Sequence, residues 1–300
     1  MKINGAEALI KALEKQNVTT IFGYPGGATL PIHDALLNTD KIVHRLVRNE
    51  QSAAHAASGY SRVSDVIGVC LSTSGPGATN LVTGIATAFM DSIPLIAITG
   101  QVATNMVGTD AFQEVDITGI TLPIVKHSYL VKDANDIPQI VEDAFHIANT
   151  GRKGPVLIDL PKDVQAQIIE YKDSVDTNII GYKPNYKPNS RQGKRFVEEL
   201  AKAKKPLFFV GGGVVHAHAS QELRDVLKKV NVPVISTLMA LGSVDCNDPQ
   251  YFGMIGLHGH PSANYAAMNC DLLVSLGARF DDRSTIVAKN FAPNAKIVHV

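Results

Sequence analysis

The stretch of this chain whose residue types could do the most chemistry is 71–80, Leu-Ser-Thr-Ser-Gly-Pro-Gly-Ala-Thr-Asn. The apolar run Val66 to Leu71 leads into it, and a helical pattern follows. Serine and glycine let a backbone approach a ligand closely, and the first N–H groups of a helix have no intrahelical partners. A strand, a small-residue turn and a helix in this order build cofactor pockets in α/β sheets. A tight connection that binds nothing would leave the same pattern.

Two further strand ends upstream repeat this design. A short strand over Val18 to Phe22 is followed by the loop Gly-Tyr-Pro-Gly-Gly-Ala at 23–28 and by a helical pattern from Leu30 to Leu37. An alternating strand over Ile42 to Val47 leads to a small-residue helix over Ser52 to Tyr60. Three consecutive strand ends of this kind predict one composite site.

Glu50 is the carboxylate of this predicted site. It lies in Arg-Asn-Glu-Gln at 48–51, in or just before the first turn of a helix. A carboxylate there also has a purely structural explanation, because acidic residues at a helix N-terminus interact favourably with the macrodipole, typically by ~0.3–1 kcal/mol. Glu50 is therefore a candidate for chemistry only together with the glycine turns near it.

Three motifs in the second half of the chain could also bind ligands. The turn Gly-Ala-Arg-Phe-Asp-Asp-Arg at 277–283 directly follows a strand and could hold a phosphate and a ribose or flavin edge, although a solvated ion-pair turn reads the same way. Gly211 to Gly213 lack the G-x-G-x-x-G spacing, so they do not by themselves indicate a dinucleotide site. His258 and His260 have no supporting carboxylate, so a loop or cofactor contact is favoured over a metal site.

Composition limits the class of protein. The 300 residues are 45% hydrophobic and 19% charged, which predicts an ordinary globular chain of two domains. The 28 basic and 28 acidic residues cancel, so nothing indicates binding to nucleic acid or to an anionic membrane. Cys70, Cys246 and Cys270 lie far apart in apolar runs and are expected to be reduced packing thiols. No apolar run approaches ~20 residues and no signal segment is visible, so we expect a cytoplasmic protein.

The elements that must position these residues are strands alternating with helices. Near-continuous apolar strands predict burial on both faces, hence doubly wound, mostly parallel sheets covered by helices, in the α/β class. In the first half they are expected at 94–99, 124–131 and 155–160, with a helix at 137–148. In the second half we expect helices at 191–203 and 219–229 and strands at 206–210, 233–236, 271–276 and 296–300. The predicted domains are residues 1–168 and 191–300, the second incomplete at its C-terminus, joined by a polar, proline-containing linker at 169–190.

Several segments along nearly the whole chain point to one family: 23–28, 49–51, 73–80, 100–101, 108–114, 151–156, 161–163 and 277–283. In these segments the chain resembles the catalytic subunit of acetolactate synthase, also called acetohydroxyacid synthase. Several of them are shared by thiamine-diphosphate enzymes at large. Ala-Phe-Gln-Glu at 111–114 and Arg-Phe-Asp-Asp-Arg at 279–283 are typical of the biosynthetic, flavin-containing branch.

The resemblance implies a transferase with a pyrimidine-binding domain and a central flavin-binding domain. Its reaction would decarboxylate pyruvate and join the remaining fragment to a second 2-oxo acid, pyruvate or 2-oxobutanoate. The products, 2-acetolactate and 2-aceto-2-hydroxybutyrate, serve branched-chain amino-acid biosynthesis toward valine and isoleucine. Glu50 would hydrogen-bond N1′ of the cofactor's aminopyrimidine and favour the tautomer that removes the proton from thiazolium C2.

The resemblance also assigns residues to each group. Catalytic roles would fall to Glu50, Gln113, Lys162 and Phe112, the last two lining the substrate channel and the flavin-facing wall. Around the pyrimidine of thiamine diphosphate we expect Tyr24, Pro25, Gly26, Glu50, Thr73, Pro76, Asn80 and Gln113. FAD, which is structural in this family, would contact Arg152, Gly211, Gly212, Gly213, Thr237, Leu238, His258, Gly277, Ala278, Arg279, Asp281 and Arg283. Phe112 and Pro76 could equally be core residues, and Lys162 could be solvated.

One departure from the family concerns magnesium. The family continues with a third domain that begins with Gly-Asp-Gly and binds Mg²⁺ and the cofactor's diphosphate, and this tripeptide does not occur here. The chain is therefore expected to be the N-terminal and central domains of a longer enzyme, with half a site and no metal ligand. The family's active sites form between subunits, which implies a homodimer or homotetramer with a possible small regulatory subunit.

Two other readings stay open. Another carboligase of the superfamily, such as glyoxylate carboligase or the flavin-free catabolic acetolactate synthase, would share many of these motifs. Glu50 counts against the former, and residues 279–283 count against the latter. The other reading is an inactive, truncated cofactor-binding fragment.

Overall fold

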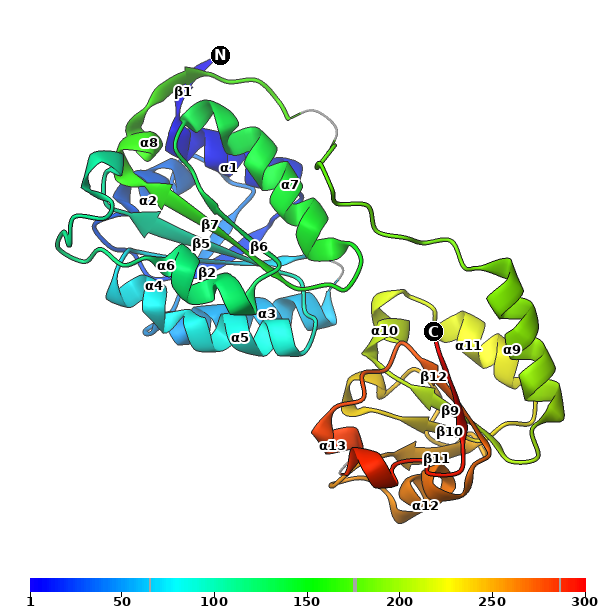
Figure 1. Ribbon diagram of the computed structural model, residues 1–300. Coiled ribbons are helices and arrows are strands. Elements are labelled where there is room, and N and C mark those ends of the chain that lie inside the picture. The colour runs from blue at the N-terminus through cyan, green and yellow to red at the C-terminus, as the bar shows by residue number, and fades with distance from the viewer. Residues whose placement is uncertain (65, 175–176, 286) are drawn as a thin grey trace. The chain divides into compact units, whose positions relative to one another are not determined.

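The computed structural model describes residues 1–64, 66–174, 177–285 and 287–300. They divide into two compact units, Met1–Asn185 and Tyr186–Val300 (Figure 1). Each unit is built on a parallel sheet, which confirms the predicted α/β class.

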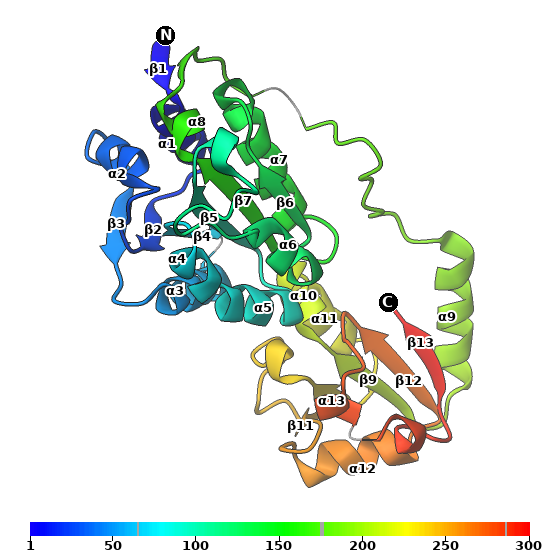
Figure 2. The same ribbon diagram turned by 60° about the vertical axis from the view of Figure 1, so that its left-hand side comes forward.

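The first unit contains a six-stranded parallel sheet in the order β3-β2-β4-β5-β7-β6. Its three central strands are buried at every position, as expected where helices cover both faces of a sheet. Helices α1 and α7 lie on one face, and α3 and α5 lie on the other (Figure 1, Figure 2). The strands are β2 (Thr20–Gly23), β3 (Val43–Leu46), β4 (Gly68–Ser72), β5 (Leu95–Gln101), β6 (His127–Leu130) and β7 (Pro155–Pro161).

Side chains cap the start of three helices of this unit, α1, α3 and α6. In α1, the Asn4 side chain accepts from the Glu7 N–H and the Glu7 carboxylate accepts from the Asn4 N–H, forming a capping box. The helices are α1 (Gly5–Lys15), α2 (Leu30–Leu36), α3 (Glu50–Val63), α4 (Pro76–Asn80), α5 (Val82–Met90), α6 (Ile117–Thr121), α7 (Ile137–Asn149) and α8 (Lys162–Ala166), with 3₁₀ turns η1 (Thr104–Met106), η2 (Leu122–Ile124) and η3 (Ala134–Asp136).

A small antiparallel sheet pairs β1 (Lys2–Asn4) with β8 (Ile168–Glu170). The strand β8 extends into the segment predicted as a linker, and the Tyr182 hydroxyl, also in that segment, donates to the Thr150 carbonyl of the first unit at 2.9 Å. Residues 175 and 176 of the predicted linker lie outside the described residues.

The second unit has a five-stranded parallel sheet in the order β11-β10-β9-β12-β13. Its strands are β9 (Pro206–Val210), β10 (Val234–Ser236), β11 (Tyr251–Met254), β12 (Leu272–Leu276) and β13 (Lys296–His299). The other elements are α9 (Ser190–Lys202), α10 (Gly212–His216), α11 (Ser220–Leu227), α12 (Pro261–Asn269), α13 (Asp282–Thr285), η4 (Leu238–Ala240) and η5 (Ala288–Asn290). The strand β9 lies between β10 and β12. The connection from β9 to β10 and the later connection that leads to β12 therefore run to opposite sides of β9.

The expectation that all three cysteines are packing thiols is confirmed for two of them. Cys70 and Cys270 are buried as packing thiols, but Cys246 is exposed, because it lies in a polar turn between η4 and β11. In the described part of the chain, every helix is too short or too polar to span a bilayer.

Candidate functional site

Most predicted residues of the first unit lie at the carboxyl edge of its sheet, and those around Glu50 follow β2, β3 and β4. The strand β2 pairs with β3 on one side and β4 on the other. The chain leaves β2 toward α2, which packs on α1, and leaves β4 toward α4, which packs on α3. A crevice at the carboxyl ends of strands, where the connections diverge, is where open α/β sheets bind ligands.

Glu50 is the first residue of α3, which packs against β4 and α4. Asn49 caps the helix, because its side chain accepts from the Gln51 N–H at 2.8 Å. The Glu50 Oε2 atom accepts from the Asn80 amide at 2.9 Å. The side chain is half-buried. The local sequence thus places one carboxylate at a helix start and fixes one of its oxygens.

Space beside Glu50 depends on Gly77. A Cβ atom at Gly77 would lie 3.2 Å from Glu50 Oε1 and 2.7 Å from Thr73 Cγ2. Thr73 in turn meets the loop after β2, where a Cβ at Gly26 would lie 2.4 Å from Thr73 Cβ. Glycines at both positions let two loops and the carboxylate meet, which is the role that the sequence suggested for them.

The loop after β2 is held by its backbone. The Ala28 N–H donates to Thr73 Oγ1 at 3.2 Å, and the Ala28 carbonyl accepts from the buried Gln165 amide at 2.7 Å. Tyr24 and Pro25 at the crest of the loop are exposed. The loop 24–26 therefore lies near Glu50 and Asn80, with Thr73 between them.

Gln113 reaches the site through its backbone. It has a left-handed conformation with φ of 58°, and a Cβ at Gly75 would lie 2.6 Å from its carbonyl oxygen. Phe112 is 88% exposed, so it is not the core residue that one reading of the sequence allowed. Pro76, the first residue of α4, is also exposed.

Glu114 folds the loop that carries Gln113. Its carboxylate accepts from the N–H groups of Gly108, Ala111 (3.0 Å) and Thr109 (3.3 Å). The hydrogen bond from Gly108, followed by that from Ala111, lowers the pKa of Glu114. Sequence reasoning assigned Glu114 no role, although an acidic residue six positions after Gly108 is the signal that could have found it.

Lys162 begins α8 at the end of β7, on the same edge of the sheet but beyond β5. Its side chain is exposed. Its neighbour Asp163 accepts from the N–H and hydroxyl of Thr104, which joins α8 to the segment after β5. The structure therefore leaves the Lys162 side chain exposed at this edge, without a contact to Glu50.

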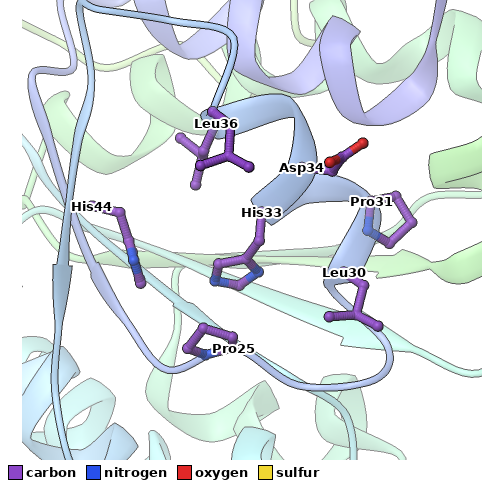
Figure 3. Close-up of a pocket in the computed structure, with 8 residues that line it drawn as sticks. Pro25, Leu30, Pro31, His33, Asp34, Leu36 and His44 are labelled. Carbon is purple, nitrogen blue, oxygen red and sulfur yellow. The ribbon is translucent and has the colours of Figure 1, made fainter.

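A hollow of about 800 Å³ beside the Pro25 loop was missed at the sequence level. It is lined by Pro25, Leu30, Pro31, His33, Asp34, Leu36, Leu37 and His44, and the two histidine rings lie near Pro25 (Figure 3). The rings meet edge to face with centroids 5.0 Å apart. Within the described residues, the Nε2 atom of neither ring has a hydrogen-bond partner. Burial lowers the pKa of both His33 and His44, which favours the neutral form of each ring.

In the second unit, the predicted glycines make close backbone contacts. A Cβ at Gly211 would lie 2.2 Å from Ala278 Cα, and one at Gly213 would lie 2.7 Å from Gly277 Cα. Gly277 itself has φ of 58°. These contacts explain the glycines structurally, and they bring the turns after β9 and β12 together at the point where the connections diverge.

Side chains at this edge of the second sheet offer groups for a ligand. Thr237, after β10, has a buried Oγ1 atom without a hydrogen-bond partner among the described residues. Leu238 is 67% exposed beside it. Arg279 lies 3.3 Å from Asp281, and Arg283 is exposed. An orphaned hydroxyl, an exposed apolar side chain and two guanidinium groups fit an anionic cofactor with a planar ring.

Three predicted residues are not drawn into these clusters. His258 is exposed in the turn after β11. Gly212 packs against Met239, where a Cβ would lie 2.9 Å from the methionine Cβ. Arg152 belongs to the first unit and precedes β7, at the edge of the sheet opposite Glu50, where it donates to Ser92 Oγ at 2.8 Å. Elsewhere, no three His, Cys, Asp or Glu side chains of the described residues converge as a metal site would require.

Comparison with known proteins gives the family. Residues 3–120 match the model "Thiamine pyrophosphate enzyme, N-terminal TPP binding domain", and residues 194–300 match "Thiamine pyrophosphate enzyme, central domain". The acetolactate synthase large subunit of Cyanidium caldarium is 54% identical over 303 positions, covering 99% of this chain and 52% of that protein. The large subunit IlvB1 of Mycobacterium tuberculosis is 50% identical, covering 99% and 48%.

An archaeal relative, the probable acetolactate synthase large subunit of Methanococcus aeolicus, is 50% identical and covers 99% of this chain and 50% of that protein. The chain spans about half the length of the curated relatives it matches. The first match covers β2 to β5 of the first sheet, and the second covers all five strands of the second sheet. The chain thus belongs to the thiamine pyrophosphate enzyme family, with its similarity concentrated on acetolactate synthase large subunits.

Proposed function

We propose that this chain supplies the pyrimidine-binding and flavin-binding parts of an acetolactate synthase, a transferase that makes 2-acetolactate or 2-aceto-2-hydroxybutyrate from pyruvate and a second 2-oxo acid. The observation that carries the proposal is the position of Glu50, at a helix start in the crevice beside β2 with one oxygen fixed by Asn80. The relatives' names and the two matched domains agree with it.

The residues present fit the pyrimidine end of thiamine diphosphate. Gly26 and Gly77 leave room that a Cβ would fill, and Glu50 Oε1 borders that room. When bound, thiamine diphosphate supplies a carbon nucleophile and an electron sink for decarboxylation. Glu50 would hold and exchange a proton at the pyrimidine nitrogen, while Thr73 and the loop 24–26 orient the ring.

Asn80 has a distinct part in this arrangement. Its amide donates to Glu50 Oε2, which leaves Oε1 to face the ligand. A half-buried carboxylate with one oxygen fixed keeps one acceptor in a constant direction, which a proton transfer requires. Pro76, at the start of the helix that ends in Asn80, would border the same pocket.

Phe112, Gln113 and Lys162 would act on the substrate side. Phe112 and Gln113 lie on the loop that follows β5, and Lys162 follows β7. The side chains of Phe112 and Lys162 are exposed rather than packed in the core. A lysine there can attract the carboxylate of a 2-oxo acid, and an aromatic ring can exclude water from it.

For the second unit we propose FAD, held at the edge where β9, β10 and β12 end. The unpaired Thr237 hydroxyl and the exposed arginines of the 279–283 turn support this. Gly211 to Gly213, Leu238, His258, Gly277, Ala278 and Asp281 would complete the site. Mg²⁺ would be held outside the described residues, because no converging set of ligands occurs among them. We further propose a homodimer or homotetramer and a small regulatory subunit.

The test is an assay of the complete encoded polypeptide with pyruvate, thiamine diphosphate, Mg²⁺ and FAD. Acetolactate that forms only when thiamine diphosphate is present is the expected result. Glyoxylate in place of pyruvate tests the other carboligase reading, and a product from glyoxylate alone would favour it. Absence of any product with either acid, in a protein that retains both cofactors, would contradict the proposal.

A further inference from the structure

Gln101, the last residue of β5, is a buried amide whose hydrogen-bonding groups are all engaged. It is 2% exposed. Its Nε2 atom donates to the Val115 carbonyl at 2.9 Å and to Asp159 Oδ2 at 3.0 Å, and its Oε1 atom accepts from the Val102 N–H at 3.0 Å. Nothing in the family resemblance gives this residue a task.

Asp159 sets the direction of that amide. It lies on β7 opposite Thr99 of β5, is 1% exposed, and accepts from the Thr99 hydroxyl at 2.7 Å. Because the oxygens of a carboxylate are acceptors, the Nε2 end of the Gln101 amide, which donates, faces Asp159. If the amide turned over, its oxygen would face both Asp159 and the Val115 carbonyl, leaving three buried acceptors together. Burial raises the pKa of Asp159 to about 7, and the bonds from Thr99 and Gln101 oppose that rise.

Val115 is where this network meets the site. It follows Phe112 and Gln113, and its carbonyl also accepts from the Ile117 N–H at 2.9 Å. Glu114 folds the loop upon itself through the N–H groups of 108–111, whereas the bond from Gln101 joins the loop to the sheet. The bonds to Glu114 therefore fix the conformation of the loop, and the bond from Gln101 fixes the position of the loop against the sheet.

We propose that Gln101, oriented by Asp159, is a positioning residue that fixes the 107–116 loop, and with it Phe112 and Gln113, against the carboxyl edge of the sheet. This rests on the proposed function in so far as those two residues border the substrate. The anchoring itself is a property of the fold and can be measured without turnover.

The experiment compares four variants of the complete encoded polypeptide. Gln101→Leu and Asp159→Leu remove the anchor while keeping a buried side chain of similar size. Asp159→Asn keeps it, because its oxygen accepts from Gln101 while its amide donates to the Thr99 hydroxyl. Thr99→Val is the matched control. It removes the hydrogen bond that the Thr99 hydroxyl donates to the Asp159 carboxylate, and it leaves the bond from Gln101 to Val115.

Two readouts are taken: hydrogen–deuterium exchange of the 107–116 amides, and steady-state kinetics with pyruvate and thiamine diphosphate. In both leucine variants we expect loop exchange to rise and kcat/KM for pyruvate to fall by roughly 2- to 10-fold, the range for losing one neutral hydrogen bond such as that from Gln101 to the Val115 carbonyl. The concentration of thiamine diphosphate that gives half-maximal rate should rise less than KM for pyruvate, since Glu50 and Asn80 are untouched and only Gln113 of the pyrimidine residues lies on the loop.

The outcomes are distinct. Exchange in the loop that rises in the leucine variants but not in Asp159→Asn or Thr99→Val supports the anchor. Unchanged loop exchange in Gln101→Leu, or the same rise in Thr99→Val, overturns it. A looser loop with unchanged kcat/KM overturns the positioning role. If the unsubstituted protein makes no acetolactate, the proposed function fails, while the exchange data still decide whether Gln101 holds the loop.

Discussion

Replacing Glu50 with glutamine should separate catalysis from folding. The side chain makes one hydrogen bond, to Asn80, and lies in the first turn of α3. Glutamine keeps the shape and can still accept from Asn80, so only the favourable interaction with the helix dipole is lost, about 0.3–1 kcal/mol. Against the 5–15 kcal/mol typical of a native protein this is small, and the fold should persist.

The catalytic effect should be much larger. A glutamine cannot exchange a proton with a ring nitrogen, and a positioned acid or base typically contributes roughly 10²- to 10⁴-fold. The assay is NMR detection of proton exchange at C2 of bound thiamine diphosphate in the complete polypeptide, alongside acetolactate formation. We expect exchange to slow by two orders of magnitude or more.

Glu7→Gln is the matched control. Glu7 is another carboxylate in the first turn of a helix, where it accepts from the Asn4 N–H in the capping box of α1. Its loss should cost similar stability and leave exchange at C2 unchanged. If Glu50→Gln keeps normal C2 exchange, the role assigned to Glu50 is refuted. If both variants slow exchange equally, stability rather than proton transfer explains the effect.

Three further predictions follow from single contacts. Gly26→Ala should lower stability by about 1–3 kcal/mol and weaken thiamine diphosphate binding measured by calorimetry, because its Cβ would lie 2.4 Å from a threonine Cβ; Gly27→Ala, with no described atom within 4 Å, should do neither. The histidine pair of the Pro25 hollow has lowered pKa values, so the unfolded chain binds more protons as pH falls below about 6.5 and stability measured by urea unfolding drops there; His44→Leu should flatten that drop. Thr237→Val should stabilise the flavin-free protein by up to about 1 kcal/mol, since it removes an unpaired buried hydroxyl, yet lower the flavin absorbance of the purified protein; equal flavin content would contradict the proposed contact.

Much of the fold could be predicted because its strands are apolar over their whole length. The strand predicted over residues 155–160, for example, is β7, buried at all seven positions. The three-residue strands β1 and β8 were missed, since three residues carry no readable alternation. The strand β11 was missed as well, because Gly253 interrupts it at φ of 98° and its pairing with β10 shifts register.

The residues of the site could also be predicted only where the sequence signal is local. Glu50 could be found because a carboxylate at a helix start after a strand is a local pattern. The Gln101 and Asp159 network could not, since it depends on the register that sets Asp159 beside Thr99, some sixty residues apart in sequence. The His33 and His44 pair likewise joins a helix to an edge strand, and only the packed structure brings the rings together.

The most direct test of the central claim is a crystal structure of the complete encoded polypeptide with thiamine diphosphate. We expect a carboxylate oxygen of Glu50 within about 2.6–3.2 Å of N1′ of the aminopyrimidine, with Asn80 still bound to the other oxygen. A pyrimidine bound elsewhere, with the Glu50 carboxylate turned into bulk solvent, would contradict the account.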